Sequence, residues 1–378
     1  MTVGFFSPLP PARTGVADYS AALLTALRKC GRVEIAPRDA DMALYHLGNN
    51  HLHREIYRLA IEKPGIAVLH DAVLNHFLLG MLDRSAYIEE FIYNYGEWHR
   101  SLAEELWANR ARSAADARYF DYPMLRGVVE RSLAVIVHNP AAATAVLRHR
   151  PDARVIEIPH LFVAPELPDP VDTIRFRAEQ GLGPRTLLAG VFGHLRESKR
   201  LCAILRAMER VWSSGANAKL LVQGAFASSD LERAISPLIR RKPRILRAPA
   251  LPEPEFWRWA AATDVCLNLR YPRAAETSGI AIRMMGIGKP VIFSSGEEIS
   301  RFPPNSCLSV DTGVDEEAML ADYLVWLATD RHAVEEIGCR AAAHIKKEHA
   351  IEKVAAQYWN LLEAALRHRA RPALKGAE

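Results

Sequence analysis

One stretch of the sequence, residues 264–295, constrains the fold more than any other, because it reads as strand, loop, helix and strand in direct succession. Residues 265–269 are an apolar run of strand length, and a second such run follows at 291–294. The helical pattern between them ends at Gly288, Lys289 and Pro290, which break helices. Strands that alternate with helices are typical of a parallel sheet. This stretch therefore predicts one part of such a sheet.

The same alternation runs through most of the chain, in two series. The first series predicts strands at 3–6, 33–36, 42–47, 65–69, 132–138 and 154–158, and the second at 186–192, 219–223, 265–269 and 291–294. Between them, residues 164–170 hold three prolines, which is typical of an interdomain linker. A chain of 378 residues is long enough for two domains. We therefore predict an α/β fold of two Rossmann-like, doubly wound parallel-sheet domains, 1–168 and 171–350.

Two segments depart from the alternation. Residues 72–131 look mostly helical and are rich in tyrosine, phenylalanine and tryptophan, so we expect an insertion that forms core under a lid or, less often, an acceptor-binding surface. The final helical pattern, 351–369, follows the end of the second series and carries an apolar stripe that includes Val354, Tyr358 and Leu362. We expect this helix to return to the first domain.

Charge and cysteine content exclude several classes of protein. The net charge of +4 is too small to indicate a nucleic-acid partner, although the excess of basic residues lies in the second half and suits an anionic ligand. The five cysteines are scattered and lack CxxC spacing, which favours reduced thiols in a cytoplasm over disulfides or a zinc site. We see no pattern of a signal peptide or of a membrane-spanning helix.

A candidate ligand site lies in the loop at 274–279. This loop joins the carboxyl end of a predicted strand to the start of a helix, where open α/β sheets bind their ligands. The backbone N–H groups of Thr277, Ser278 and Gly279 have no partner within the helix, and with the helix dipole they form an anion site. Glu276 would repel a phosphate and suits sugar hydroxyls instead. The alternative is a plain helix cap with an acid that matches the dipole.

Other candidates occupy further strand-to-helix junctions. Gly15 follows the first predicted strand, where the backbone either approaches a ligand or only turns. His70 and Asp71 end the strand at 65–69, and a structural histidine is the alternative there. Arg196 and Lys199 follow the strand at 186–192, where cations meet a diphosphate or are simply solvated.

The sequence resembles the retaining glycosyltransferases of family 4, which have the GT-B fold, over nearly its whole length. The resembling segments are SPLPPARTGVADYS (7–20), YHLGNN (45–50), LHD (69–71), VHN (137–139), FGHLRESKR (192–200) and NLRYPRAAETSGIAIRMMGIGKPVIFS (268–294). The last is the most specific, because it joins an acidic loop to a helix that ends in GKPV. The resemblance implies two domains that face a cleft, with the C-terminal helix crossing back to the first.

The resemblance also implies roles for individual residues. His70, Lys199 and Glu276 would be catalytic: His70 would contact the transferred sugar, Lys199 would neutralise the diphosphate, and Glu276 would bind sugar hydroxyls. The remaining matched positions would bind substrate, namely Gly15, Asp71, Arg196, Arg270, Thr277, Ser278 and Gly279. Fixed cations and N–H donors stabilise the charge that develops on a leaving diphosphate more than they stabilise the ground state.

The resemblance implies the partners as well. The donor would be a nucleotide diphosphate sugar, GDP-mannose first and UDP-sugars next, and the acceptor would be a glycan or a lipid-linked acceptor. A lipid-linked acceptor would bring a cytoplasmic protein to the inner face of a membrane. Enzymes of this kind require neither a cofactor nor a metal.

Two positions depart from the family pattern. A second glutamate that often holds the ribose is replaced by Met284, and the arginine after the usual strand glycine is His194. Two other classes stay open. A catalytically inactive GT-B protein that binds a nucleotide or glycan would share the scaffold, but it would typically have lost Lys199 or Glu276. A nicotinamide-dependent oxidoreductase needs GxGxxG after a strand, which PLPPARTG matches poorly.

Overall fold

The structure is a computed structural model, and it describes residues 1–12 and 14–370. Arg13, in the predicted loop after the first strand, lies outside the described residues. The chain divides into two compact units. The first contains Met1–Leu161, Pro272–Thr277 and the described residues from Glu348 onward, and the second contains Phe162–Tyr271 and Ser278–Lys347. The short segment Pro272–Thr277 thus packs with the first unit, although the chain on either side of it belongs to the second.

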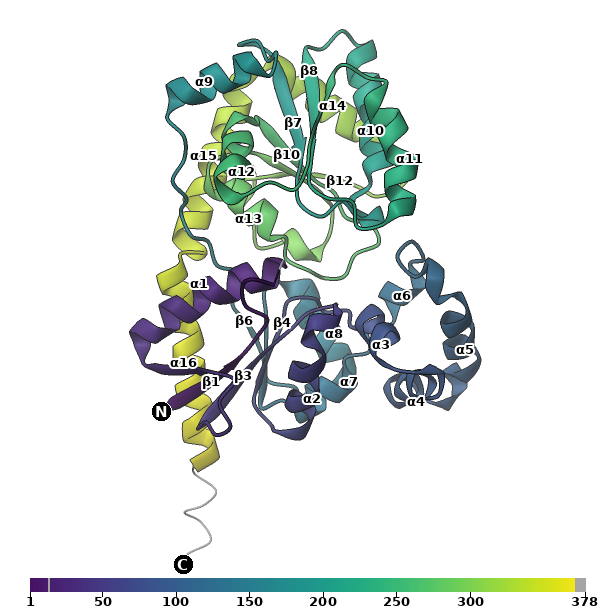
Figure 1. Cartoon of the computed structure of the whole chain (residues 1–378), viewed down its shortest axis with the longest axis vertical. Helices are drawn as coiled ribbons and strands as arrows, with labels where there is room; N and C mark the ends of the chain where they lie inside the picture. Colours follow the sequence, from purple (N-terminus) through teal and green to yellow (C-terminus); the bar gives the residue numbers. More distant parts are fainter. Residues whose placement is uncertain (13, 371–378) are drawn as a thin grey trace, which may run out of the picture. The chain divides into compact units, whose positions relative to one another are not determined.

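The described part of the first unit has one sheet of six parallel strands, in the order β2-β1-β3-β4-β5-β6 (Figure 1). These strands are β1 (Thr2–Phe6), β2 (Arg32–Ile35), β3 (Met42–Leu47), β4 (Ile66–Leu69), β5 (Ala134–Val137) and β6 (Val155–Glu157). Helices cover both faces of the sheet, so alternate residues of one strand enter two different cores. Along β4, Ile66 and Val68 pack with the helices α1 (Gly15–Cys30) and α16 (Ile351–Ala370).

The other face of this sheet carries Ala67 and Leu69 of β4. They pack with α2 (Arg54–Glu62), α7 (Arg126–Arg131) and α8 (Pro140–His149), the last two of which flank β5 in the sequence. The 3₁₀ helix η1 (His51–His53) precedes α2. β4 and β5 are each four residues long, and all of these residues are buried. Helices therefore cover both faces of the sheet at these strands and keep its apolar side chains out of water.

Helix α16 packs alongside α1 within the first unit (Figure 1). Its buried residues Val354, Tyr358, Leu362 and Ala365 recur at helical spacing and join the core that includes Leu23 and Leu27 of α1. The Tyr358 hydroxyl also shares a buried hydrogen bond of 2.9 Å with the hydroxyl of Tyr19. Helix α16 is therefore part of the core of the first unit.

The segment between β4 and β5 is helical. It contains α3 (Asn75–Met81), α4 (Arg84–Tyr95), η2 (Glu97–His99), α5 (Arg100–Asn109), η3 (Arg110–Arg112) and α6 (Arg118–Asp121). Tyr87, Phe91 and Tyr119 are fully buried there, whereas Trp98 is 99% exposed. Most of its aromatic residues therefore form or line a core.

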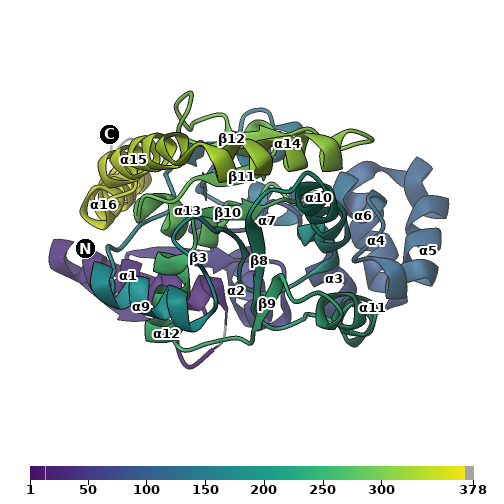
Figure 2. The same cartoon turned by 90° about the horizontal axis from the view of Figure 1, so that it is seen from above.

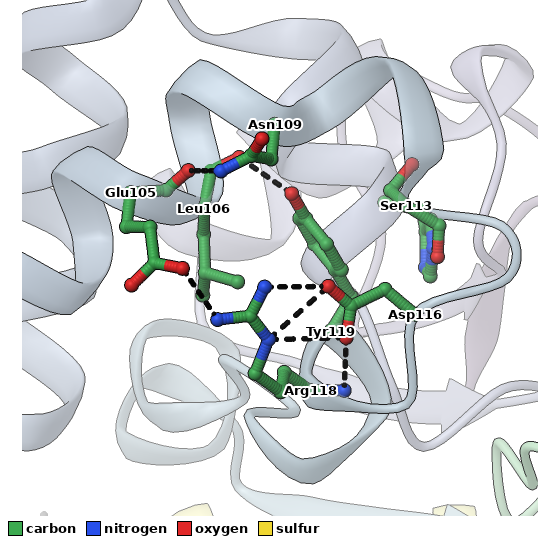
Figure 3. A network of polar contacts seen from close by, with 8 residues as sticks. Glu105, Leu106, Asn109, Ser113, Asp116, Arg118 and Tyr119 are labelled. Atoms are coloured by element: carbon green, nitrogen blue, oxygen red, sulfur yellow. Dashed lines mark hydrogen bonds and ion pairs between the residues drawn. The ribbon is translucent and has the colours of Figure 1, made fainter.

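Figure 3 shows the contacts that join α5 to α6 in this insertion. The Arg118 guanidinium bridges Asp116 and Glu105, each at 2.7 Å, and the Tyr119 hydroxyl donates to the carbonyl oxygen of Leu106 at 2.5 Å. The ion pairs are partly exposed and contribute little, on the order of 0–1 kcal/mol. The buried tyrosine ring therefore holds the two helices together more than the charges do.

The described part of the second unit also has one sheet of six parallel strands, in the order β12-β11-β10-β7-β8-β9. The strands are β7 (Leu187–Val191), β8 (Ala218–Gln223), β9 (Ile245–Ala248), β10 (Val265–Asn268), β11 (Val291–Ser294) and β12 (Leu308–Val310). The helices are α9 (Pro170–Glu179), α10 (Leu201–Ser213), α11 (Ser229–Arg240), α12 (Glu253–Ala262), α13 (Gly279–Gly286), α14 (Glu316–Thr329) and α15 (Arg331–Glu348), with η4 (Glu197–Lys199) and η5 (Glu297–Ile299).

Both faces of this second sheet are again buried. Leu187 and Ala189 of β7 pack with α10 and α14, which lie side by side over one face (Figure 2). Leu188 joins the opposite core, with α12, α13 and α15. The predicted α/β fold with two doubly wound parallel sheets is therefore confirmed. Among the described residues, no helix is both long and apolar enough to cross a bilayer.

The packing of α16 predicts a large loss of stability for Leu362→Ala. Leu362 is fully buried, so removing its side chain leaves a cavity that costs about 2–5 kcal/mol in the free energy of unfolding. The control is Asn360→Ala on the exposed side of the same helix, with an expected change within about 0.5 kcal/mol. Urea unfolding measures both, and equal losses for the two variants would contradict the packing of this helix.

Candidate functional site

His70 and Asp71 follow β4 directly, at the carboxyl edge of the first sheet. The backbone N–H of His70 extends the sheet by donating to Leu47 at 2.9 Å. The Asp71 carboxylate accepts a hydrogen bond of 2.8 Å from the backbone N–H of Asn49, in the loop after β3. Asp71 thus joins two neighbouring strand ends, and the binding role that the resemblance implies for it stays a prediction.

The segment Pro272–Thr277, which contains Glu276, lies against the same edge of the first unit. The Asn139 side-chain amide, directly after β5, donates at 2.9 Å to both the carbonyl oxygen of Ala275 and the hydroxyl of Thr277. The backbone N–H of Ala72 donates to the Ala274 carbonyl oxygen at 3.2 Å. Strand ends that carry His70 and Asn139 therefore meet the acidic loop within one unit.

Ala275 adopts a left-handed backbone conformation, with φ +51°. That conformation costs a residue with a Cβ about 1–2 kcal/mol, so surrounding contacts must hold it. Asn139 supplies such a contact, and its role was missed in the sequence. The signal available there was an Asn before Pro140, which also predicts its second role as the N-cap of α8.

Helix α13 begins at Gly279, with Ser278 as its N-cap. The Ser278 hydroxyl accepts from the Ala281 N–H at 3.3 Å and donates to the Asn268 side chain at 3.0 Å, which ties the helix start to the end of β10. In the described parts of the chain, no residue accepts a hydrogen bond from the backbone N–H of Thr277, Ser278 or Gly279. These amides are therefore available to an anion.

Arg196 directly precedes η4 and Lys199 is the last residue of that helix, which follows β7 of the second unit. The Lys199 side chain is buried, and its ammonium donates a hydrogen bond to the carbonyl oxygen of Phe192 at the end of β7. Arg196 is exposed. The neighbouring Arg200 has a structural role instead, because its guanidinium pairs with the fully buried carboxylate of Glu316 at 3.0 Å. Of the two predicted site cations, Lys199 and Arg196, Lys199 has the more defined position.

Arg270 and Met284 belong to the same unit as Lys199. The backbone N–H of Arg270 donates to the Ser294 hydroxyl at 3.0 Å, and its guanidinium donates to the Leu269 carbonyl oxygen at 2.9 Å. Met284 is fully buried in the apolar core under α13, so its side chain offers nothing to a ribose. The expected position of a ribose ligand is thus part of the core.

Gly15 is the first residue of α1, and a Cβ placed on it would meet nothing within 4 Å. Gly224, in contrast, has φ +136°, and a Cβ there would lie 1.8 Å from the carbonyl oxygen of Gly193. Packing among the described residues therefore requires glycine at position 224 but not at position 15. The open space at Gly15 suits the approach of a ligand to the start of the helix.

His70 also belongs to a cluster of buried and partly buried imidazoles that the motifs in the sequence did not reveal. The cluster consists of His46 in β3, His53 in η1, His70 after β4, His138 after β5 and His160 after β6. The Tyr19 ring lies among them, with its centroid 4.8 Å from those of His70 and His160 and 5.3 Å from that of His138. The signal in the sequence was a histidine at four successive strand ends.

Burial keeps these imidazoles uncharged. It lowers the pKa of His53 and of His138 to about 4, and that of His160 to about 3. The pKa values of His46 and His70 lie well below the usual range for the same reason, and the neighbouring histidines lower them further. The histidine cluster is therefore neutral near pH 7. The described residues contain no group of His, Cys, Asp or Glu side chains that could hold a metal ion.

Comparison with known proteins shows similarity at the level of structure. No family model and no curated protein matches the sequence. Sucrose-phosphate synthase from Thermosynechococcus elongatus superposes with a TM-score of 0.67 at 14% identity, covering 97% of this chain and 100% of that one. Anabaena HepE in complex with UDP-glucose gives 0.64 at 13%, covering 96% and 100%. WaaG, a glycosyltransferase involved in lipopolysaccharide biosynthesis, gives 0.63 at 12%, covering 95% and 99%. These structures show that the fold is of the GT-B type.

The neutral cluster predicts that the protein loses stability in acid. Each cluster histidine binds a proton more readily in the unfolded chain, so the free energy of unfolding falls as pH drops below about 6.5. For one imidazole with a folded pKa of about 4, the loss at about pH 5 is roughly 2 kcal/mol. Urea unfolding at about pH 7.5 and pH 5 measures it. His138→Asn keeps a donor for the Ile158 carbonyl oxygen but cannot titrate, so its dependence on pH should be shallower. An equally steep dependence would contradict this prediction.

Proposed function

We propose that this protein is a retaining glycosyltransferase of family 4, which moves a sugar from a nucleotide diphosphate sugar to a glycan or lipid-linked acceptor. One observation carries the proposal. At the start of α13, the backbone amides of Thr277, Ser278 and Gly279 have no described acceptor, and the residue before them is the acidic Glu276. Amides suit the phosphates of such a donor, and a carboxylate suits the hydroxyls of its sugar.

The chemistry requires that charge be stabilised on the departing diphosphate. Lys199 and the amides at the start of α13 would supply positive charge and N–H donors that are already in place, so they would not need to reorganise during the reaction. Gly15 would bring the start of α1 to the same diphosphate, and Arg196 would add a cation. His70 and Glu276 would contact the transferred sugar, and Asp71, Arg270 and Thr277 would help to bind the donor.

The donor would be GDP-mannose or a UDP-sugar. Because HepE has been solved in complex with UDP-glucose, this sugar nucleotide belongs among the first donors to be tested. The experiment is transfer from isotopically labelled sugar nucleotides to glycan and lipid-linked acceptors, preceded by a thermal-shift panel of nucleotide diphosphates. A ligand at 100 times its Kd stabilises by about 2.7 kcal/mol, which shifts the melting temperature measurably. Stabilisation by none of the nucleotides, together with no transfer, would refute the proposal.

A catalytically inactive GT-B protein that binds a nucleotide or glycan is the second candidate. The burial of Met284, where the family often has a ribose-binding glutamate, favours it. The retention of both Lys199 and Glu276 argues against it. Stabilisation by a sugar nucleotide without turnover, across the acceptors tested, would select this second function.

Substitutions of Lys199 and of Glu276 should impair different properties, namely the rate of transfer and the affinity for the sugar nucleotide. Lys199→Ala removes a cation from the place where charge builds up, so we expect kcat to fall by about 10²–10³ while nucleoside binding changes less. Glu276→Gln replaces one acceptor oxygen with a donor. We expect it to weaken the binding of the sugar nucleotide but not of the bare nucleotide diphosphate, which has no sugar hydroxyls.

Steady-state kinetics and calorimetry distinguish these two effects. The matched control is Arg206→Ala, which removes an exposed cation from α10 that pairs with Glu317 on the surface. We expect that variant to keep the parent kcat. Equal weakening of both ligands by Glu276→Gln would instead make Glu276 a structural cap.

Transfer should survive EDTA. The proposed site provides the diphosphate with Lys199, Arg196 and helix amides, so no divalent cation is needed for charge neutralisation. Initial rates measured with and without an excess of EDTA should agree. A loss that magnesium or manganese restores would contradict this prediction.

A further inference from the structure

His46 and His70 form a hydrogen-bonded pair at the edge of the first sheet. Nδ1 of His46 lies 3.0 Å from Nε2 of His70, and the two rings stack at 5.2 Å with an interplanar angle of 22°. His46 is fully buried, whereas His70 is only partly buried. A neutral imidazole has one N–H and one lone pair, so one ring of this pair donates and the other accepts.

The neighbouring histidines show how protons are distributed in the cluster. Nδ1 of His53 lies 2.9 Å from the carbonyl oxygen of His46, and Nδ1 of His138 lies 2.9 Å from that of Ile158. Nδ1 of His160 lies 2.9 Å from the carbonyl oxygen of Leu161. A carbonyl oxygen only accepts, so each of these rings carries its proton on Nδ1.

The same reasoning fixes the proton of His46. Its Nε2 is buried and has no hydrogen-bond partner among the described residues. A proton on that nitrogen would leave a buried N–H without an acceptor, which proteins tolerate less often than an unused acceptor. The proton of His46 therefore belongs on Nδ1, and His46 donates to Nε2 of His70. As a neutral ring that accepts at Nε2, His70 must carry its own proton on Nδ1.

The surroundings maintain this arrangement. The groups that face the pair include the Phe5 ring of β1, the Tyr19 ring of α1, itself bonded to Tyr358 of α16, and the imidazoles of His53, His138 and His160. The adjacent carboxylate of Asp71 accepts from the Asn49 N–H. No described residue forms a hydrogen bond with Nδ1 of His70, and this nitrogen is not among the buried unpartnered atoms. It is therefore open to a ligand.

We propose that His46 is a positioning residue that holds His70 in its Nδ1–H tautomer, so that His70 presents a neutral hydrogen-bond donor to an oxygen of the sugar. The part that concerns the sugar rests on the proposed function; the part that concerns the tautomer does not. Nε2 of His70 is occupied by the buried donor, so a ligand meets a defined N–H and not a mixture of two tautomers.

The decisive measurement is the tautomer of His70 in the unmodified protein, from ¹⁵N–¹H correlation spectra of its histidine rings near pH 7. His70→Asn removes one set of ring signals and thereby assigns them. We expect the proton of His70 on Nδ1. A proton on Nε2 would overturn the proposal, whatever the protein does to sugars.

Two variants of His46 test its role. His46→Phe keeps a stacked ring without a donor, so we expect the proton of His70 to move wholly or partly to Nε2. His46→Asn places an amide N–H near the position of Nδ1 and should restore the original tautomer. An unchanged tautomer in His46→Phe would overturn the proposal, and if that variant does not fold, failure of His46→Asn to keep the Nδ1–H tautomer would do so.

Binding shows whether the tautomer matters to the sugar. We expect His46→Phe to raise the KM for the sugar nucleotide about tenfold, the value of one hydrogen bond, and to leave the affinity for the bare nucleotide diphosphate unchanged. His46→Asn should recover most of this loss. Equal weakening of both ligands would overturn the link to the sugar. Failure of the proposed function appears differently: no sugar nucleotide binds, while the spectra still report the Nδ1–H tautomer.

Discussion

The structure depends on the burial of short parallel strands on both faces. In the first unit, β4 and β5 have only four residues each, and every one of them is buried. Such strands have no surface for polar side chains, so polar residues collect where the strands end. In a parallel sheet all the carboxyl ends lie along one edge. His70 after β4 and Asn139 after β5 therefore come to lie along one edge of the first unit, with the loop that contains Glu276.

The second unit obeys the same constraint with different residues. Its strand ends are held by close backbone approach, as at Gly224, and by side-chain contacts such as that between Ser278 and Asn268. The second contact has a double effect. It anchors α13 to β10, and the same serine caps the helix by accepting a hydrogen bond from the Ala281 N–H. One residue thus both caps the helix and ties its start to the sheet.

Much of the fold could be predicted from the sequence, because apolar runs and caps are local signals. The strand at 265–269, the helix after Gly279 and the stripe of the last helix are all readable within a few residues. The start of the second unit is different. The prolines at 164–170 suggested a break there, but the second unit begins earlier, at Phe162. The Phe162 ring packs so closely on Gly286 that a Cβ added to Gly286 would lie 2.3 Å from a ring carbon. That contact joins residues far apart in sequence.

The candidate site was predicted only in part, for the same reason. Glu276, Lys199 and His70 carry motif signals in the sequence. His46 lies in the resembling segment YHLGNN, but nothing there gives it a role, because a single histidine in an apolar strand looks like an ordinary core residue. Its meeting with His70 depends on β3 lying beside β4, which no local pattern shows. The attachment of residues 272–277 to Asn139 is equally nonlocal.

The neutrality of the histidine cluster can be connected with the proposed chemistry. In sugar transfer, positive charge develops on the sugar ring as its bond to the leaving group breaks. An imidazolium beside the ring would repel that charge, whereas a neutral N–H can still hold a hydroxyl. The burial of His70 itself lowers the pKa of its ring most, and the neighbouring His138, His46 and His160 lower it further, so protonation of that ring is unfavourable. A cluster that weakens the fold in acid would therefore make His70 a donor without charge, and the cations would be left to the diphosphate.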